Sequence, residues 1–261
     1  MNEIEIKEAV KAFSFGFSAE RVAEECDISV EQAREIQKNS RRKLKKGGHQ
    51  DVSKVAYRLI DLSKWNGNVN FDLVRSAGID GVIIRTGFGS ENPRQIDRRF
   101  EEYYAGAKAA GLYVGAYHYS YAKDAAGALG EAEFMLKIIK GKSFELPIYG
   151  DFEEQGKLSK TVCTEMVKAF CNRLEMSGAW AGIYSYDTFF RDKLSADIPK
   201  RYTVWSARVE NIFPKCVSAD YLGIWQNSWK GKISGISGDV DLDYCFKDFP
   251  ALIKRTGLNR F

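Results

Sequence analysis

The stretch Gly81-Val82-Ile83-Ile84-Arg85 is a short apolar run, and it is followed by a helical pattern over 97–110 and a second strand-like run over 112–120. Short runs rich in β-branched residues are typical of buried strands, whereas the longer segment between them ends at Gly111, a common helix stop. A strand, a helix and a strand in this order predict a βαβ unit whose two strands are parallel.

The same alternation extends over the rest of the chain from residue 57. We expect further strands at 57–62, 146–153, 180–184, 202–208, 221–226 and 240–245, and further helices at 71–77, 124–139 and 161–176. About eight strands in about 205 residues favour a closed barrel. Only short helical pieces separate the last strands, so the expected fold is α/β, an irregular TIM-like (β/α)5(β)3 barrel.

A doubly wound open sheet is the alternative fold. Such a sheet normally carries a glycine-rich phosphate loop after its first strand, and this chain has Ser63-Lys64-Trp65-Asn66-Gly67 there instead.

The first 46 residues follow a different pattern and predict a small all-α module of three helices. We expect helices at 4–13, 19–26 and 30–39, with Ser18 and Ser29 as caps. This segment resembles the small helix-turn-helix modules of bacterial regulators. A basic and glycine-containing linker over 47–56 would then join residues 1–46 to a barrel over 57–261.

The basic run over 41–46 holds five Lys or Arg residues in six positions. Such a run can bind the phosphates of nucleic acid, bind an anionic cell-wall polymer, or act only as a solvated tether. The net charge of +4 does not choose among these alternatives.

Composition excludes several classes of protein. Hydrophobic residues make up 44% of the 261 residues and charged residues 28%, as in globular proteins. Apolar runs are far shorter than a membrane span, and the first 30 residues carry six glutamates and no apolar core of a secretory signal. We therefore expect synthesis in the cytoplasm without a signal peptide. Two separated histidines and five cysteines without a CxxC motif predict no metal and no cofactor, and leave the disulfide state open.

Acidic residues at predicted strand ends are the first candidates for chemistry, because barrel active sites lie at those ends. Asp61 closes the first strand of the barrel, and Asp151 and Glu153 close the strand over 146–153. Alternation predicts that Asp151 and Glu153 point to one face and Phe152 to the helix layer. Two carboxyl groups crowded in a lumen should raise at least one pKa, which keeps a proton donor protonated near neutrality.

A second acidic pattern, Asp239-Val240-Asp241-Leu242-Asp243, lies near the C-terminus. It lacks the glycine and the glutamate that an EF-hand has at positions six and twelve, so we do not expect calcium there. Tyrosine, tryptophan and glutamine residues gather at other strand ends and would suit the apolar faces and hydroxyls of sugar rings. These candidate substrate-binding residues are Tyr117, Tyr119, Tyr184, Trp205, Trp225 and Gln226.

Together these stretches resemble glycoside hydrolase family 25, the lysozymes of the Chalaropsis type, over residues 57–250. The resemblance rests on the order and spacing of seven stretches, which lie at 59–65, 81–87, 111–119, 147–153, 182–184, 224–226 and 235–242. It implies an irregular barrel that cleaves the β-1,4 bond between N-acetylmuramic acid and N-acetylglucosamine in peptidoglycan. Gly150 and Asn227 depart from the family pattern, where bulkier or aromatic residues are common, and would widen the cleft or loosen a subsite.

The resemblance also implies roles for single residues. Glu153 would be the general acid and Asp151 would assist the substrate's own N-acetyl group, although a carboxylate nucleophile is the other retaining scheme. Asp61 and Asp241 match the remaining acidic positions, and Arg85 is expected to bind substrate.

Three other readings stay open: a catalytically silent sugar-binding protein, a DNA-binding regulator, and a hydrolase of chitinase type. A cell-wall enzyme without a signal peptide would be an endolysin released by a holin, or would use another export route.

Overall fold

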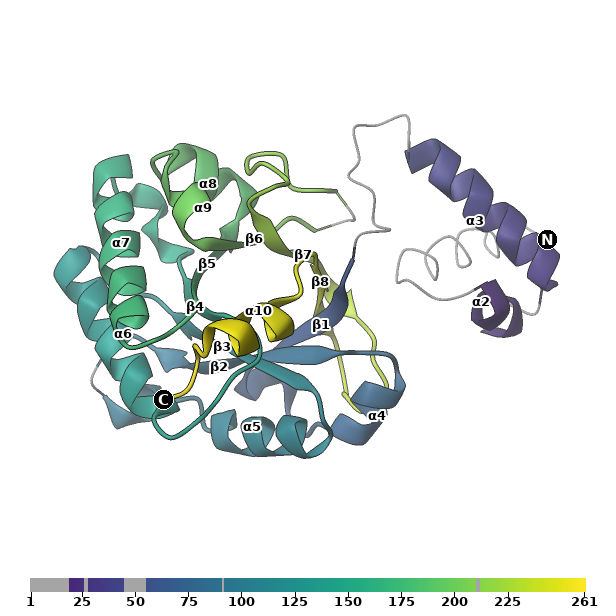
Figure 1. Cartoon of the computed structure of the whole chain (residues 1–261), viewed down its shortest axis with the longest axis horizontal. Helices are drawn as coiled ribbons and strands as arrows, with labels where there is room; N and C mark the ends of the chain where they lie inside the picture. The colour runs from purple at the N-terminus through teal and green to yellow at the C-terminus, as the bar shows by residue number, and fades with distance from the viewer. Residues whose placement is uncertain (1–18, 26–27, 45–54, 91, 210–211) are drawn as a thin grey trace. The chain divides into compact units, whose positions relative to one another are not determined.

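The computed structural model describes residues 19–25, 28–44, 55–90, 92–209 and 212–261. The chain divides into two compact units, residues 1–51 and 52–261. The described part of the first unit contains α2 (Ala19–Glu25) and α3 (Val30–Leu44), drawn in purple in Figure 1. Val22 and Ile36 pack in the small core that these two helices share.

The start of α3 is formed as its sequence predicts. The Ser29 hydroxyl accepts the Gln32 N–H at 3.1 Å, and the Gln32 side chain accepts the Ser29 N–H at 2.9 Å, which is a reciprocal capping box. The helix continues to Leu44, five residues beyond the predicted end at Asn39. The helix expected over 4–13 lies outside the described residues.

The second unit is a closed barrel in which neighbouring strands follow the chain order. The strands are β1 (Tyr57–Leu62), β2 (Gly81–Phe88), β3 (Tyr113–Tyr119), β4 (Ile148–Asp151), β5 (Ala181–Tyr186), β6 (Thr203–Ala207), β7 (Leu222–Gly231) and β8 (Val240–Cys245). Strands β1 to β7 pair in parallel, and β8 closes the barrel by pairing antiparallel with both β7 and β1. The predicted barrel is confirmed, and an open doubly wound sheet is excluded.

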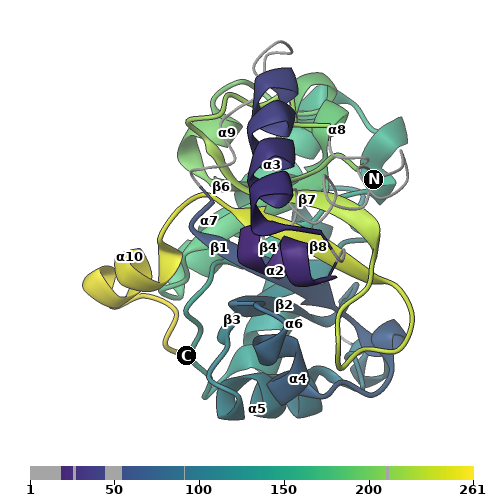
Figure 2. The ribbon, with the colours of Figure 1, turned by 90° about the vertical axis from the view of Figure 1, so that its right-hand side faces the viewer.

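Helices cover the barrel unevenly, as predicted from the thin late connections. The helices of this unit are α4 (Phe71–Ser76), α5 (Phe100–Ala109), α6 (Ala125–Ile139), α7 (Lys160–Met176), α8 (Asp187–Asp192), α9 (Ile198–Arg201) and α10 (Phe249–Thr256). In both ribbon views α4 and α5 lie along the same side of the barrel (Figures 1 and 2), where the rings of Phe71 and Tyr103 meet edge to face at 5.8 Å. No helix stands between β6 and β7 or between β7 and β8 in the described residues.

The barrel interior is filled by alternate residues of the strands. Leu59, Ile83, Tyr149 and Ile224 belong to one buried cluster, and α10 adds Phe249 to it. Because α10 follows the last residue of the antiparallel strand β8, it covers the barrel end opposite to the one where the parallel strands finish. The end of the barrel where the parallel strands finish is therefore not covered by α10, and polar groups can gather there.

Several boundaries differ from their predicted positions. β4 ends at Asp151 and not at Glu153, whose backbone (φ −119°, ψ −29°) is helical and leads into the 3-10 turn η4 (Glu154–Lys157). β7 continues to Gly231, beyond the predicted end at Gln226. Among the described residues, none of the helices combines the length and the apolar character that crossing a bilayer requires.

Candidate active site

The barrel brings the predicted acids to one end, although they come from strands of opposite direction. Asp61 lies near the carboxyl end of β1 and Asp151 at the end of β4. Asp241 lies at the beginning of β8, and because β8 runs antiparallel it pairs in register with Asp61. Residues separated by 180 positions in the sequence therefore face each other across two adjacent strands.

Gln226 joins Asp61 to Asp241. Its Nε2 donates to Asp61 Oδ2 at 2.8 Å and lies 3.4 Å from Asp241 Oδ2, while its Oε1 accepts from the hydroxyl of Tyr184 at 2.7 Å and the indole of Trp229 at 2.9 Å. Both ends of this amide are thus occupied by protein groups, and the residue is 2% exposed. We therefore revise its expected role from substrate binding to positioning of the two carboxyl groups.

Desolvation and like charges hold this cluster of acids partly protonated. Burial raises the pKa of Asp61 well above its usual range, and Asp241 and Asp243 raise it further, against the hydrogen bond from Gln226. Burial, followed by the charge of Glu153, raises the pKa of Asp241 to about 6. The cluster can therefore hold a proton near neutral pH.

Asp243 is a member of this cluster that the sequence analysis did not select. It is 2% exposed, its Oδ1 accepts the Trp205 indole N–H at 2.7 Å, and burial raises its pKa well above the usual range. Asp61 hydrogen-bonds to it, and this bond requires a proton on one of the two groups. Its sequence signal was the spacing of two from Asp241, which places both side chains on one face of a strand.

Asp151 and Glu153 lie together although the strand does not reach Glu153. Burial and then the charge of Glu153 raise the pKa of Asp151, and burial also raises the pKa of Glu153. The Tyr184 side chain hydrogen-bonds to Glu153 and lowers that pKa in part. Phe152 lies between them in sequence and points outward, where its ring meets Phe170 of α7 edge to face at 5.7 Å.

The Asp151 carboxyl group has an acceptor atom to spare. Its Oδ1 is buried and has no hydrogen-bond partner among the described residues. A buried acceptor without a partner is costly, since burial removes water without replacing its hydrogen bond. This oxygen is therefore suited to accept an N–H group from a bound molecule.

Two predicted sugar-contacting tryptophans occupy other places. Trp205 is 1% exposed and lies inside the barrel, 4.4 Å from the Tyr184 ring, so it cannot stack on a sugar and instead supports Asp243. Trp225 is 4% exposed, packs on Phe213 and donates its indole N–H to the Arg208 carbonyl. Period-two alternation puts it on the face opposite to Gln226. For both residues the expected stacking role is wrong.

The three predicted tyrosines, unlike Trp225, lie near the acids. Tyr117 and Tyr184 are 8% and 7% exposed, and the charges of Asp61 and Asp151 act on both phenols. Tyr119 is half-buried and donates to Glu154 Oε1 at 2.8 Å. Tyr119 also pairs in register with Asp151 across β3 and β4, and the charges of Glu153 and Asp151 raise the pKa of its phenol.

The two departures from the family pattern do not open the cleft. A Cβ atom at Gly150 would lie 2.6 Å from the Phe152 ring and 2.8 Å from the Phe170 ring, so this glycine makes room for packing against α7. Asn227 is buried at 1% exposure. The expectation of a widened cleft is therefore wrong for Gly150, which faces away from it.

Exposed aromatic rings near this end were missed by the sequence analysis. Trp65 follows β1 in the 3-10 turn η2 (Lys64–Asn66) and is 79% exposed, and Trp229 is 54% exposed in the extension of β7. Tyr121, which follows β3, is 53% exposed. These three residues differ from the aromatic residues of the core only in the exposure of their side chains, which the sequence does not reveal.

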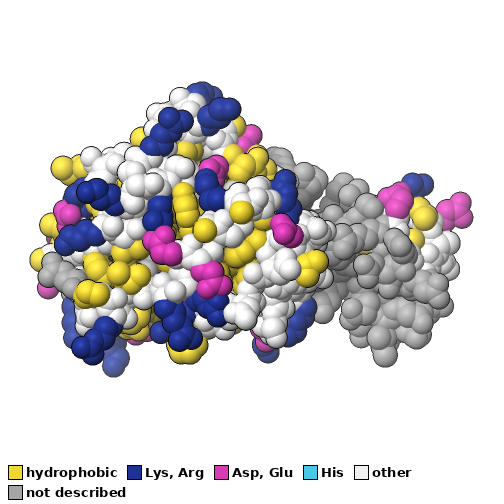
Figure 3. All heavy atoms as spheres, turned by 90° about the horizontal axis from the view of Figure 1, so that it is seen from below, with side chains coloured by type: hydrophobic (Ala, Val, Ile, Leu, Met, Phe, Trp, Pro, Cys, Tyr) yellow, Lys and Arg dark blue, Asp and Glu magenta, His cyan; other side chains and the backbone are white. Residues whose placement is uncertain are grey.

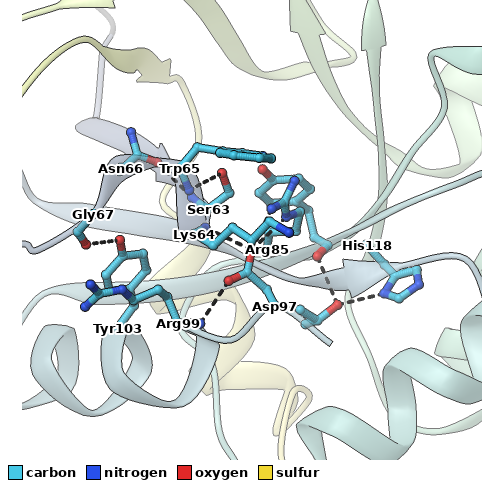
Figure 4. Close-up of polar contacts among 12 residues, drawn as sticks. Ser63, Lys64, Trp65, Asn66, Gly67, Arg85, Asp97, Arg99, Tyr103 and His118 are labelled. Carbon is cyan, nitrogen blue, oxygen red and sulfur yellow. Dashed lines mark hydrogen bonds and ion pairs between the residues drawn. The ribbon is translucent and has the colours of Figure 1, made fainter. Parts of the chain in front are cut away.

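The positive charge of Arg85, on β2, lowers the pKa of Asp151. Figure 4 shows Arg85 joined to Asp97, a second residue that the sequence analysis did not select. Within the described ranges, no three His, Cys, Asp or Glu side chains are arranged to hold a metal ion.

A closed α/β barrel with carboxyl groups crowded at the carboxyl end of its strands is the arrangement of barrel glycoside hydrolases. Comparison with known families identifies which of them. The profile of Glycosyl hydrolases family 25 matches residues 60–236, and the chain belongs to this family.

Named relatives agree with this assignment. The autolytic lysozyme of Clostridium acetobutylicum is 32% identical over 184 residues, which cover 70% of this chain and 54% of that protein. The chain therefore spans about half the length of this relative. The uncharacterized protein YegX of Escherichia coli K12 is 26% identical over 207 residues, 75% of each chain.

Solved structures share the barrel. The CTP1L endolysin is 29% identical with a TM-score of 0.68, over 76% of this chain and 70% of that one. The bacterial lysozyme from Streptomyces coelicolor is 23% identical with a TM-score of 0.64, over 77% and 98% of the two chains, and shows the common fold.

Proposed function

We propose that the chain is a peptidoglycan hydrolase, an N-acetylmuramidase that cleaves the β-1,4 bond between N-acetylmuramic acid and N-acetylglucosamine. One observation carries the proposal: in a family 25 barrel, a buried Asp151 oxygen has no hydrogen-bond partner among the described residues, and the charge of Glu153, whose own pKa burial raises, acts on Asp151. One group can accept an N–H while the other supplies a proton.

The proposed first step uses the substrate's own acetamido group. Its carbonyl oxygen attacks the anomeric carbon as the glycosidic C–O bond breaks, and Glu153 gives its proton to the leaving oxygen. Asp151 accepts the acetamido N–H and stabilises the positive charge of the oxazolinium. In the second step water attacks the anomeric carbon as its bond to the acetamido oxygen breaks, and Glu153 accepts a proton from that water, so the acetamide is restored and the configuration is retained.

Asp61 and Asp241 have an electrostatic role in this scheme. Gln226 hydrogen-bonds to both, and the charge of Asp241 raises the pKa of Asp61 and of Asp243. Because the charge of Glu153 in turn raises the pKa of Asp241, the two groups of acids act on each other electrostatically.

The test is reducing-sugar release from purified peptidoglycan. We expect Glu153→Gln to lower the rate about 10²- to 10⁴-fold, since general acid catalysis is worth that much. Glu154→Gln is the matched control, because Glu154 is the next residue, is exposed and bonds to Tyr119. It should keep most of the activity. Wild-type rates in Glu153→Gln would refute the assignment.

Product analysis separates the remaining alternatives. Muramic acid at the new reducing end supports the muramidase, and glucosamine would indicate a hydrolase of chitinase type. NMR of the first-formed anomer and trapping of an oxazoline distinguish substrate assistance from a carboxylate nucleophile. A wild-type chain that binds glycan without cleaving it would indicate a silent sugar-binding protein.

We further propose that residues 1–46 bring the enzyme to an anionic polymer of the cell wall. The support is the basic run over 41–46 in the sequence. On the face of the barrel seen in Figure 3, by contrast, Lys and Arg side chains are interspersed with Asp and Glu. Sedimentation with cell walls and a gel shift with DNA would compare the two candidate ligands.

The site of action follows from this function. We propose that the chain acts on the cell wall and reaches it after release by a holin, or by another export route. Fractionation of producing cells before and after lysis would test this proposal.

A further inference from the structure

Asp97 joins three segments at the edge of the site. Its side chain is 1% exposed, and its Oδ2 accepts from Arg85 Nε at 2.8 Å and from the Lys64 N–H at 2.9 Å. Its Oδ1 accepts the Arg99 N–H at 3.0 Å, and its own N–H donates to the Thr86 carbonyl at 2.9 Å. One buried carboxylate therefore fixes β2, the turn after β1 and the approach to α5 (Figure 4).

The first contact of Asp97 holds the Arg85 guanidinium in place. Arg85 Nη2 also lies 2.8 Å from Asp97 Oδ2, so two nitrogens of one guanidinium meet the same carboxylate, and the Arg85 side chain is only 12% exposed. Such a paired guanidinium has little freedom to rotate. Its charge acts on Asp151 from the lumen side of β2. Asp97 thus fixes the orientation of the Arg85 guanidinium, whose positive charge acts on Asp151.

The second contact of Asp97 anchors the turn that carries the aromatic ring of Trp65. The Lys64 N–H that binds Asp97 begins η2, and Ser63 and Asn66 close that turn by a capping box with a Ser63 N–H to Asn66 Oδ1 bond of 2.9 Å. Trp65 stands between them with its ring exposed, and the Lys64 ammonium lies 4.9 Å from the ring centroid. A large exposed ring on an anchored turn is a preorganised surface for the apolar face of a sugar.

We propose that Asp97 is a positioning residue with two separable tasks: through Arg85 it orients the charge beside Asp151, and through the Lys64 N–H it holds Trp65 as a stacking surface for an N-acetylhexosamine ring of the glycan strand. The inference rests on the proposed glycosidase function. It adds a binding surface and the residue that connects this surface to the acids.

Two substitutions separate the tasks. Asp97→Asn keeps a carbonyl oxygen for the Lys64 N–H but removes the charge that pairs with Arg85 and the second oxygen, which accepts the Arg99 N–H, so we expect kcat to fall about tenfold or more while KM changes little. Asp97→Ala removes both tasks, so kcat should fall and KM should rise. Trp65→Ala should raise KM and leave kcat nearly unchanged. Combined with Asp97→Ala it should add little to KM, because the stacking surface is already lost.

Binding without turnover gives a second readout. Chitotetraose should quench the tryptophan fluorescence of the wild type and of Asp97→Asn, and should quench Trp65→Ala and Asp97→Ala much less. Asp80→Asn is the matched control, because Asp80 accepts the Arg58 N–H at 2.8 Å just before β2, at the other end of the same strand. It should match the wild type in kcat, KM and quenching.

The outcomes are distinguishable. If the wild type releases reducing sugar and both Asp97 variants keep its kcat and KM, this inference is overturned and the proposed function stands. If Asp97→Asn raises KM as much as Asp97→Ala does, the two tasks are not separable and the proposal is also overturned. A wild type without activity overturns the proposed function and this inference together.

Discussion

At the scale of a single residue, burial of the Asp243 carboxyl group in the site lowers the stability of the fold. Its Oδ1 accepts the Trp205 indole N–H, and the carboxyl group is 2% exposed beside Asp61 and Asp241. A buried carboxyl group disfavours its charged form, so its pKa in the folded chain is raised above the value of about 3.9 expected in the unfolded chain. The folded chain therefore binds this proton more tightly than the unfolded chain.

We expect Asp243→Asn to stabilise the fold at pH 8 and to change it little below pH 4. A raised folded pKa means that stability is lost as the pH rises from the unfolded value toward the folded one, and the amide escapes this loss. The gain should be about 0.5–2 kcal/mol in the free energy of unfolding, measured by urea denaturation at both pH values. Asp239→Asn, an exposed neighbour paired with Lys232, is the control. Equal gains at both pH values would contradict this account.

At the scale of one element, β4 depends on a residue without a side chain. Gly150→Ala should destabilise the barrel by about 1–3 kcal/mol, because the added Cβ meets two phenylalanine rings closer than 3 Å. Gly130→Ala, on α6, is the matched control: its Cβ would lie 3.7 Å from Ser90 and should stabilise the helix by up to about 1 kcal/mol. Thermal unfolding measures both. A neutral Gly150→Ala would mean that the packing of α7 on β4 can shift.

The positions of the strands could be predicted from the sequence better than their directions or the exposure of their side chains. Apolar runs placed all eight strands, because each buried run is bounded by turns or helices. The direction of β8 could not be predicted, since a strand's sequence does not reveal its orientation, and this direction decides that Asp241 and Asp243 meet Asp61. Nor could alternation separate Trp205, which is buried in the lumen, from Trp65, which is exposed in a turn.

The candidate site was predictable in its acids and less so in its supporting residues. Asp61, Asp151 and Glu153 were found because acids are conspicuous after apolar strands. Asp97 was not, because it lies 12 residues from Arg85 in a polar segment where many charges are solvated. Partners that act through a hydrogen bond leave no periodic pattern in the sequence.

At the scale of the whole molecule, the two units divide the proposed tasks. All of the acids and tyrosines described in the site belong to residues 52–261. We therefore expect a fragment of residues 52–261 to hydrolyse soluble glycan strands with a kcat within about twofold of the full chain, and to sediment less with intact walls. A much larger loss of kcat would show that the first unit takes part in the chemistry.

The closing strand also has a consequence for biosynthesis. β8 is the last strand of the barrel to be synthesised, it supplies two of the clustered acids, and it gives β1 its second neighbour. A nascent chain, or one shortened by a stop codon before Val240, has neither a sealed barrel nor a full set of acids. The proposed wall-degrading activity is thereby reserved for polypeptides whose translation has run past β8.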